Sequence, residues 1–137
     1  MTKSLLLALS IWIAQQTGLP LPREMPELNL VTEQEMCDEM DIKDGCEYIR
    51  AFYEDGVITA RTSLDPTSLL DMSLLVHELT HHFQVVNHIK YACVGQSEPL
   101  AYHTQVRWLL EAGVKDPWKL IQSSEFTVAT YAMCSQE

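Results

Sequence analysis

The stretch DPTSLLDMSLLVHELTHHFQVVNHI, residues 65–89, is the segment around which the rest of this chain is organised. It predicts one long helix, because Asp65 suits the N-cap position, Pro66 suits the first helical position, and apolar residues dominate the positions after Pro66. Within it, His77 and His81 lie four residues apart. On a helix that spacing places both imidazoles on one face, close enough to share one metal ion.

The pentapeptide HELTH, residues 77–81, carries the chemistry. Neutral imidazole nitrogens are ligands that Zn²⁺ accepts readily. Glu78 projects at a neighbouring angle, where its carboxylate can accept a proton from water that the metal activates. The pentapeptide therefore predicts a zinc site with a general base. The alternative interpretation is a helix with two surface histidines.

Zinc needs a third protein ligand, and Glu98 is the favoured candidate. It opens the next predicted helix, seventeen residues after His81, and the loop between them is long enough for an antiparallel return. Its alternative role is to stabilise that helix N-terminus. His88 would lie about 10 Å along the helix from His81. His82 would point about 100° away from His81, and His103 has little support in the sequence.

The HELTH pentapeptide followed by Glu98 resembles the gluzincin branch of the zincin metallopeptidases, whose compact members are called minigluzincins. The resemblance covers residues 44–112, about half of the chain. It implies that His77, His81 and Glu98 hold zinc, and that Glu78 is the general base in hydrolysis of a peptide or protein. It also implies an α+β, zincin-like fold, in which a small sheet or hairpin packs on the active-site helix and the following glutamate-bearing helix.

The chain departs from that family after the third ligand. Gluzincins often carry an aspartate about one turn beyond the glutamate, whereas Tyr102 and His103 stand there in this sequence. Tyr102, His103 and Tyr131 are candidates for stabilising the transition state, and the alternative for Tyr102 is packing in the core. The resemblance also suggests that a hairpin strand, for example 57–60, pairs with an extended substrate.

Two other functions remain open from the sequence. One is a zinc-binding pseudoenzyme or interaction module without turnover, which the small size of the chain favours. The other is a hydrolase held inactive by an inhibitory partner or by its own tail, in which Cys134 or Glu137 would reach the zinc.

The rest of the chain fits a single domain, residues 1–137. Patterning and turn residues predict a connector at 19–26, a strand at 28–31, and a helix to residue 40 with a Thr32–Glu35 capping box. They also predict paired strands at 47–53 and 57–62, a helix at 98–112 capped by Ser97, and a short helix opened by Asp116-Pro117. The tail after Ser123 has no assignment.

The net charge and the hydropathy of the chain argue against two classes of binding partner, nucleic acid and the membrane interior. The net charge of −10 argues against nucleic acid, which needs clustered basic residues. Residues 24–55 hold eleven acidic residues, either as a solvated face or as a rim that attracts basic ligands. No apolar run reaches the roughly 18 residues that a membrane span requires.

The cysteines and the N-terminus bear on location. Pairing of Cys37 with Cys46 and of Cys93 with Cys134 is favoured, and reduced, buried thiols are the alternative. Disulfides would indicate a periplasmic or secreted protein, and thiols a cytoplasmic one. Residues 5–14 resemble the apolar part of a signal peptide, but a buried first helix at 4–17, ending at Gly18, is favoured.

Overall fold

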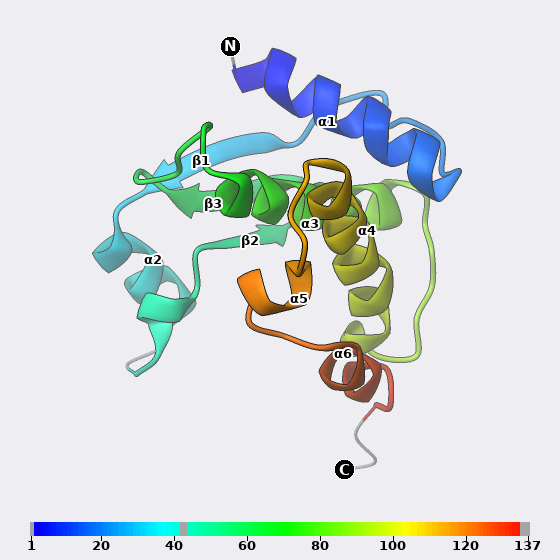
Figure 1. The fold of residues 1–137 in the computed structure, drawn as a ribbon. Coiled ribbons are helices and arrows are strands. Elements are labelled where there is room, and N and C mark those ends of the chain that lie inside the picture. Colours follow the sequence, from blue (N-terminus) through cyan, green and yellow to red (C-terminus); the bar gives the residue numbers. More distant parts are fainter. Residues whose placement is uncertain (1, 42–43, 135–137) are drawn as a thin grey trace.

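A three-stranded sheet and six α-helices make up the described part of the chain, residues 2–41 and 44–134, in this computed structural model (Figure 1). In chain order the elements are α1 (Thr2–Thr17), β1 (Glu27–Val31), α2 (Glu33–Met40), the 3₁₀ turn η1 (Cys46–Tyr48), β2 (Ala51–Glu54), β3 (Val57–Arg61), α3 (Leu69–Val86), the 3₁₀ turn η2 (Val94–Ser97), α4 (Glu98–Glu111), α5 (Pro117–Leu120) and α6 (Glu125–Tyr131). The fold is therefore α+β, as predicted. None of the described helices is both long and apolar enough to cross a membrane.

The sheet has the strand order β1-β3-β2, with β1 parallel and β2 antiparallel to β3. β2 and β3 form the predicted hairpin, and its two-residue turn places Asp55 and Gly56 in the left-handed region, at φ 48° and 82°. Such turns match the twist of paired strands. β3 is thus the central strand, so the suggestion that residues 57–60 pair with a substrate is wrong. Within the described residues, β2 has a neighbouring strand on one side only.

The start of α3 differs from the prediction. The helix begins at Leu69 rather than at Pro66, and Ser68 is its N-cap, accepting a hydrogen bond from the backbone N–H of Asp71. The side chain of Asp65 closes a turn of its own before the helix. A short polar side chain such as that of aspartate can accept a hydrogen bond either from the backbone of a turn or from the first turn of a helix, and the two compete.

The end of α3 is also earlier than predicted. The helix stops at Val86 instead of Ile89, because His88 adopts a left-handed conformation at φ 55°. The N–H of Ile89 then turns back to the carbonyl of Gln84 at 3.1 Å, the kind of closure found at helix C-termini. His88 therefore lies beyond the helix.

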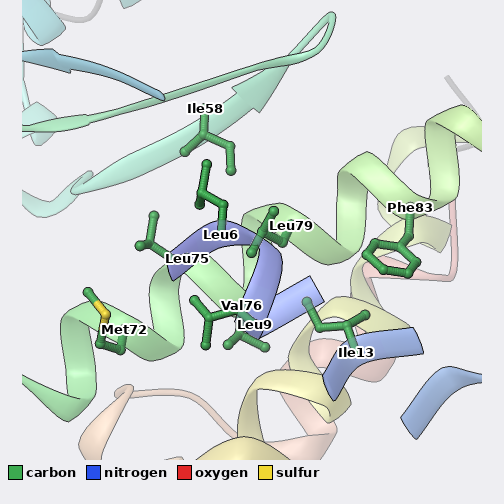
Figure 2. Packing of buried hydrophobic residues seen from close by; sticks show 9 residues of the cluster. All are labelled: Leu6, Leu9, Ile13, Ile58, Met72, Leu75, Val76, Leu79 and Phe83. Atoms are coloured by element: carbon green, nitrogen blue, oxygen red, sulfur yellow. The ribbon is translucent and has the colours of Figure 1, made fainter. Parts of the chain in front are cut away.

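The hydrophobic core lies between α1, α3 and the sheet (Figure 2). Leu6 and Ile13 of α1 are 2% and 0% exposed, and Ile58 of β3 is 0% exposed. The buried face of α3 contributes side chains at the helical spacing of three and four residues: Met72, Leu75, Val76, Leu79 and Phe83. The favoured prediction of an N-terminal helix ending at Gly18 is confirmed, but only one face of that helix is buried, since Leu7 and Ile11 are 43% and 45% exposed.

Two disulfides join the pairs that the sequence favoured, Cys37–Cys46 and Cys93–Cys134, with Cα atoms 5.5 and 5.8 Å apart. All four cysteines are therefore paired in this structure, rather than present as thiols. Disulfides persist in oxidising compartments, so this pairing is compatible with an extracellular location.

Local predictions elsewhere had mixed outcomes. The Thr32–Glu35 capping box and the Asp116 cap of α5 are confirmed. The strand predicted at 47–53 begins only at Ala51, because the 3₁₀ turn η1 occupies the residues after disulfide-bonded Cys46. Ser97 occupies the N-cap position of α4, as predicted, but its side chain does not cap the helix, because its hydroxyl donates to the carbonyl of Val94. The tail without an assignment contains α6.

Candidate metal centre

A second face of α3, turned away from the core, lines an open cleft. Leu70, Leu74, His77 and His81 recur at helical spacing along this face, and all four contact a cleft of about 640 Å³. Residues of η1 and β2 line one wall of the cleft, and residues of α4 and α5 line the other. The same helix therefore supplies both the core and the floor of the cleft.

Three candidate metal-ligand atoms converge on this floor. The Nε2 atoms of His77 and His81 are 3.3 Å apart. The Oε1 atom of Glu98, from the first turn of α4, is 3.4 Å from Nε2 of His77 and 2.6 Å from Nε2 of His81. The structure thus brings together the three residues that the sequence predicted as metal ligands.

These separations fit a zinc ion. Ligand atoms about 2.0–2.1 Å from a tetrahedral zinc ion lie about 3.4 Å from one another. Two of the three separations agree with that value, and the third, between His81 and Glu98, is shorter at 2.6 Å. Moreover, Oε1 of Glu98 is buried and accepts no well-directed hydrogen bond from the described residues. A buried carboxylate oxygen aimed between two imidazole nitrogens is suited to a cation.

Two glutamines that the sequence analysis missed orient the histidines. Oε1 of Gln105 lies 2.9 Å from Nδ1 of His77, and Oε1 of Gln84 lies 2.9 Å from Nδ1 of His81. An acceptor at Nδ1 holds the proton on that nitrogen, so the lone pair of Nε2 faces the candidate site. Gln105 is 28 residues from His77, and no sequence pattern pairs them. Gln84 lies three residues after His81, a spacing that could have indicated the contact.

Further hydrogen bonds fix the orientation of both amides. The hydroxyl of Ser73 donates to the carbonyl of Leu70 and therefore accepts from Nε2 of Gln105. Nε2 of Gln84 donates to the carbonyl of Ser97 and to the hydroxyl of Tyr91. Each amide nitrogen is thus occupied, which leaves each amide oxygen for a histidine.

The charges around the site favour a carboxylate ligand. Burial raises the pKa of Glu98, but its interactions with His77 and His81 outweigh burial and bring the pKa down to about 2. Burial lowers the pKa of His81, but hydrogen bonding and the charges of Glu98 and Glu78 raise it overall. Glu98 is therefore ionised at neutral pH and attracts a positive group between the imidazoles.

Glu78 lies next to these three candidate ligands, and its carboxylate together with His77 and His81 also forms a group that could hold a metal ion. A ligand atom of Glu78 is within 4.8 Å of those of His77 and His81, and the residue lines the cleft. Glu98 makes the shorter contacts to both imidazoles, so it is the better third ligand and Glu78 is left beside the site. Burial raises the pKa of Glu78, against the opposing charges of the two histidines. A raised pKa makes a carboxylate a stronger proton acceptor, as a general base requires.

Comparison with known proteins supplies a family but no activity. A family described as a domain of unknown function, DUF6647, matches residues 1–136. The chain belongs to this family. No curated protein and no solved structure matches it. Function therefore has to be read from the geometry of the site.

The three residues that the sequence suggested for stabilising the transition state differ in their distance from the cleft. Tyr102 lines the cleft, and its ring packs edge-on against His77 with centroids 4.5 Å apart. Burial and the charge of Glu98 raise the pKa of Tyr102 to about 12. His103 is exposed, packs against Trp118 and is not among the residues lining the cleft. Tyr131 contacts the ring of Tyr102 from α6, with centroids 6.1 Å apart.

The remaining alternatives for a metal ligand lie outside the site. His82 is buried on another face of α3, where its ring nitrogens contact the hydroxyl of Tyr53 and the carbonyl of Glu24. The tail hypothesis does not hold for Cys134, because its sulfur is bonded to Cys93. Glu137, the other tail candidate, is outside the described residues.

Proposed function

We propose that this chain is a zinc-dependent peptidase or amide hydrolase. The observation that carries the proposal is the convergence of His77, His81 and Glu98 on one point of an open cleft, with Glu78 beside them. A structural zinc site is typically closed by four protein ligands, whereas a catalytic one has three and faces a cleft. The described residues offer three candidate ligands at an open cleft, which supports a catalytic rather than a structural site.

Zinc bound by these residues would supply a Lewis acid that polarises the scissile carbonyl and acidifies water. Glu78 is positioned to accept a proton from the attacking water and to donate it to the leaving nitrogen. The two glutamines keep the imidazoles oriented throughout. Tyr102, protonated because its pKa is about 12, is available to donate a hydrogen bond to the oxyanion that develops.

The open edge of β2 is suited to align an extended substrate. The N–H of Arg61 donates to the carbonyl of Arg50, so these two residues form a hydrogen-bonded pair of the ladder. Hydrogen-bonded and non-hydrogen-bonded pairs alternate along an antiparallel ladder, so Phe52–Thr59 and Glu54–Val57 are hydrogen-bonded pairs as well. The backbone groups of Ala51 and Tyr53 then point away from β3. β2 packs against α3, and its residues line the cleft. The N–H of Tyr53 is directed at the carboxylate of Glu78, so the backbone groups of Ala51 and the carbonyl of Tyr53 are the ones that can pair with a peptide lying across the metal centre.

The test combines metal content with cleavage. Purified protein should contain about one zinc per chain by elemental analysis, and it should cleave members of a mixed peptide library detected by mass spectrometry. Glu78→Gln should retain the zinc and lose cleavage by at least about 100-fold, because it removes the proton acceptor. Glu39→Gln, an exposed glutamate on α2, is the matched control and should cleave like wild type.

Two results would contradict the proposal. Cleavage that persists in Glu78→Gln rejects the role of Glu78 as base. Zinc binding by the wild type without cleavage of any peptide favours the alternative, a zinc-binding interaction module without turnover.

A further inference from the structure

The cleft continues past the metal centre into a second hollow. This hollow has a volume of about 590 Å³ and shares four lining residues with the first part of the cleft: Phe52, Glu78, His81 and Glu98. The metal ligands His81 and Glu98 therefore stand at the junction of the two hollows. A peptide lying across the metal centre would occupy both of them.

The second hollow is apolar away from the metal centre. Its outer wall consists of Val85, Ile89, Tyr91 and Val94, which come from the end of α3 and from the segment before α4. Val94 is 87% exposed and Val85 is 54% exposed. Large apolar side chains grouped in a hollow beside a polar centre are typical of a surface that binds a ligand.

Hydrogen bonds, a disulfide and close packing fix the position of this outer wall. Gln84, which orients His81, also donates hydrogen bonds to Tyr91 and to the carbonyl of Ser97. The Cys93–Cys134 disulfide ties the same segment to the end of the described chain. A side chain at Gly95 would overlap the carbonyl group of Tyr131, so η2 packs directly on α6. A pre-formed wall can select a side chain without a large ordering cost.

The direction of β2 indicates which half of a bound peptide would lie over the second hollow. Ala51 lines the first part of the cleft and Tyr53 lines the second hollow, so β2 runs from the first to the second. Antiparallel pairing is the commoner and slightly more stable arrangement for an added strand. An antiparallel peptide runs the opposite way, with its N-terminal half over the second hollow.

We propose that the second hollow is the subsite for a large apolar side chain on the N-terminal side of the scissile bond. The assignment rests on the proposed hydrolase function, since it uses the same metal centre and the same strand edge. It narrows the substrate class to peptides with an aliphatic or aromatic residue just before the cleaved bond.

The experiment measures binding separately from cleavage. The probes are acetylated, amidated hexapeptides of alanine with one leucine or one serine at each position in turn. Zinc-loaded Glu78→Gln is titrated with each probe by calorimetry. The best leucine peptide should bind about tenfold more tightly than its serine counterpart, which is the gain expected from burying a leucine side chain.

Two variants of the outer wall test its location. Val94→Asp and Val85→Asn, each combined with Glu78→Gln, should abolish the preference for leucine. Both side chains are exposed, so the fold should be retained, which thermal unfolding would check. Leu110→Asp, a half-exposed leucine on α4 that lines neither hollow, is the matched control and should keep the tenfold preference.

Cleavage by the wild-type protein then identifies the side of the bond. Leucine should precede the cut found by mass spectrometry, and a preference only after the cut overturns the assignment. Equal binding of leucine and serine peptides, or a preference that survives both wall variants, also overturns it. If binding behaves as expected and wild type cleaves no probe, the hydrolase proposal fails while the apolar binding site stands.

Discussion

Replacing Gln105 with methionine should weaken zinc binding while leaving the fold in place. Gln105 is 1% exposed, and methionine has a similar length and volume, so the packing between α3 and α4 should survive. The change removes the amide oxygen that accepts from Nδ1 of His77, 2.9 Å away. Without it, the proton is free to move to Nε2, the atom that must face the ion.

The size of the effect can be worked out from that lost contact. Leaving a buried N–H without an acceptor costs about 1–3 kcal/mol. His77 is 7% exposed, so water offers little compensation. Loss of comparable partners of metal-binding histidines weakens metal affinity by about 10–100-fold. We therefore expect the dissociation constant for zinc to rise by that factor in Gln105→Met.

Competition with a chromogenic chelator would measure the affinity, and thermal unfolding of the metal-free proteins would confirm that the variant folds. Gln105→Glu is the control, because it keeps an oxygen acceptor beside Nδ1 and should bind zinc at least as well as wild type. Wild-type affinity in Gln105→Met would refute the orienting role. An equal loss in both variants would mean that packing, rather than the acceptor, matters.

Three further predictions concern the ligand set and the stability of the fold. Glu98→Ala should abolish stoichiometric zinc binding, as measured by elemental analysis, because it removes the carboxylate oxygen that lies 2.6 and 3.4 Å from the Nε2 atoms of the two histidines. One zinc per chain in this variant would reject Glu98 as a ligand. Ile13→Ala should lower the free energy of unfolding by about 2–5 kcal/mol in chemical denaturation, because this side chain of α1 is fully buried in the core. A change below about 0.5 kcal/mol would mean that α1 is not part of the cooperative core. Replacing both Cys93 and Cys134 with serine should cost about 4 kcal/mol, the loop entropy of a 41-residue separation, and an unchanged midpoint of unfolding would contradict it.

Local features of this chain could be predicted from its sequence alone. The four-residue spacing of His77 and His81 fixes their common face on any helix, whatever surrounds it. The Thr32–Glu35 capping box and the Asp116 cap satisfy backbone donors only three residues away, so their outcome depends little on the rest of the chain. The Asp55-Gly56 hairpin turn was predictable for the same reason.

Where two local structures were compatible with the same stretch of sequence, only the folded structure shows which of them forms. Asp65 and Ser68 could each have capped α3, and Ser68 does so because the side chain of Asp65 is already used in the preceding turn. Likewise, a β-rich pattern at 47–53 forms a 3₁₀ turn in its first part, next to the disulfide at Cys46. Such cases are settled by contacts that a linear pattern does not contain.

The meeting of distant groups at the candidate site depends on the tertiary structure. Contact between α3 and α4 brings Glu98 to the two histidines and places Gln105 behind His77, across 28 residues of sequence. The parallel pairing of β1 with β3 makes β3 the central strand, so that, among residues 2–41 and 44–134, one edge of β2 has no neighbouring strand. The physical reason is that burial of one face of α3 against α1 and the sheet fixes where its other face points, and that face carries the histidines.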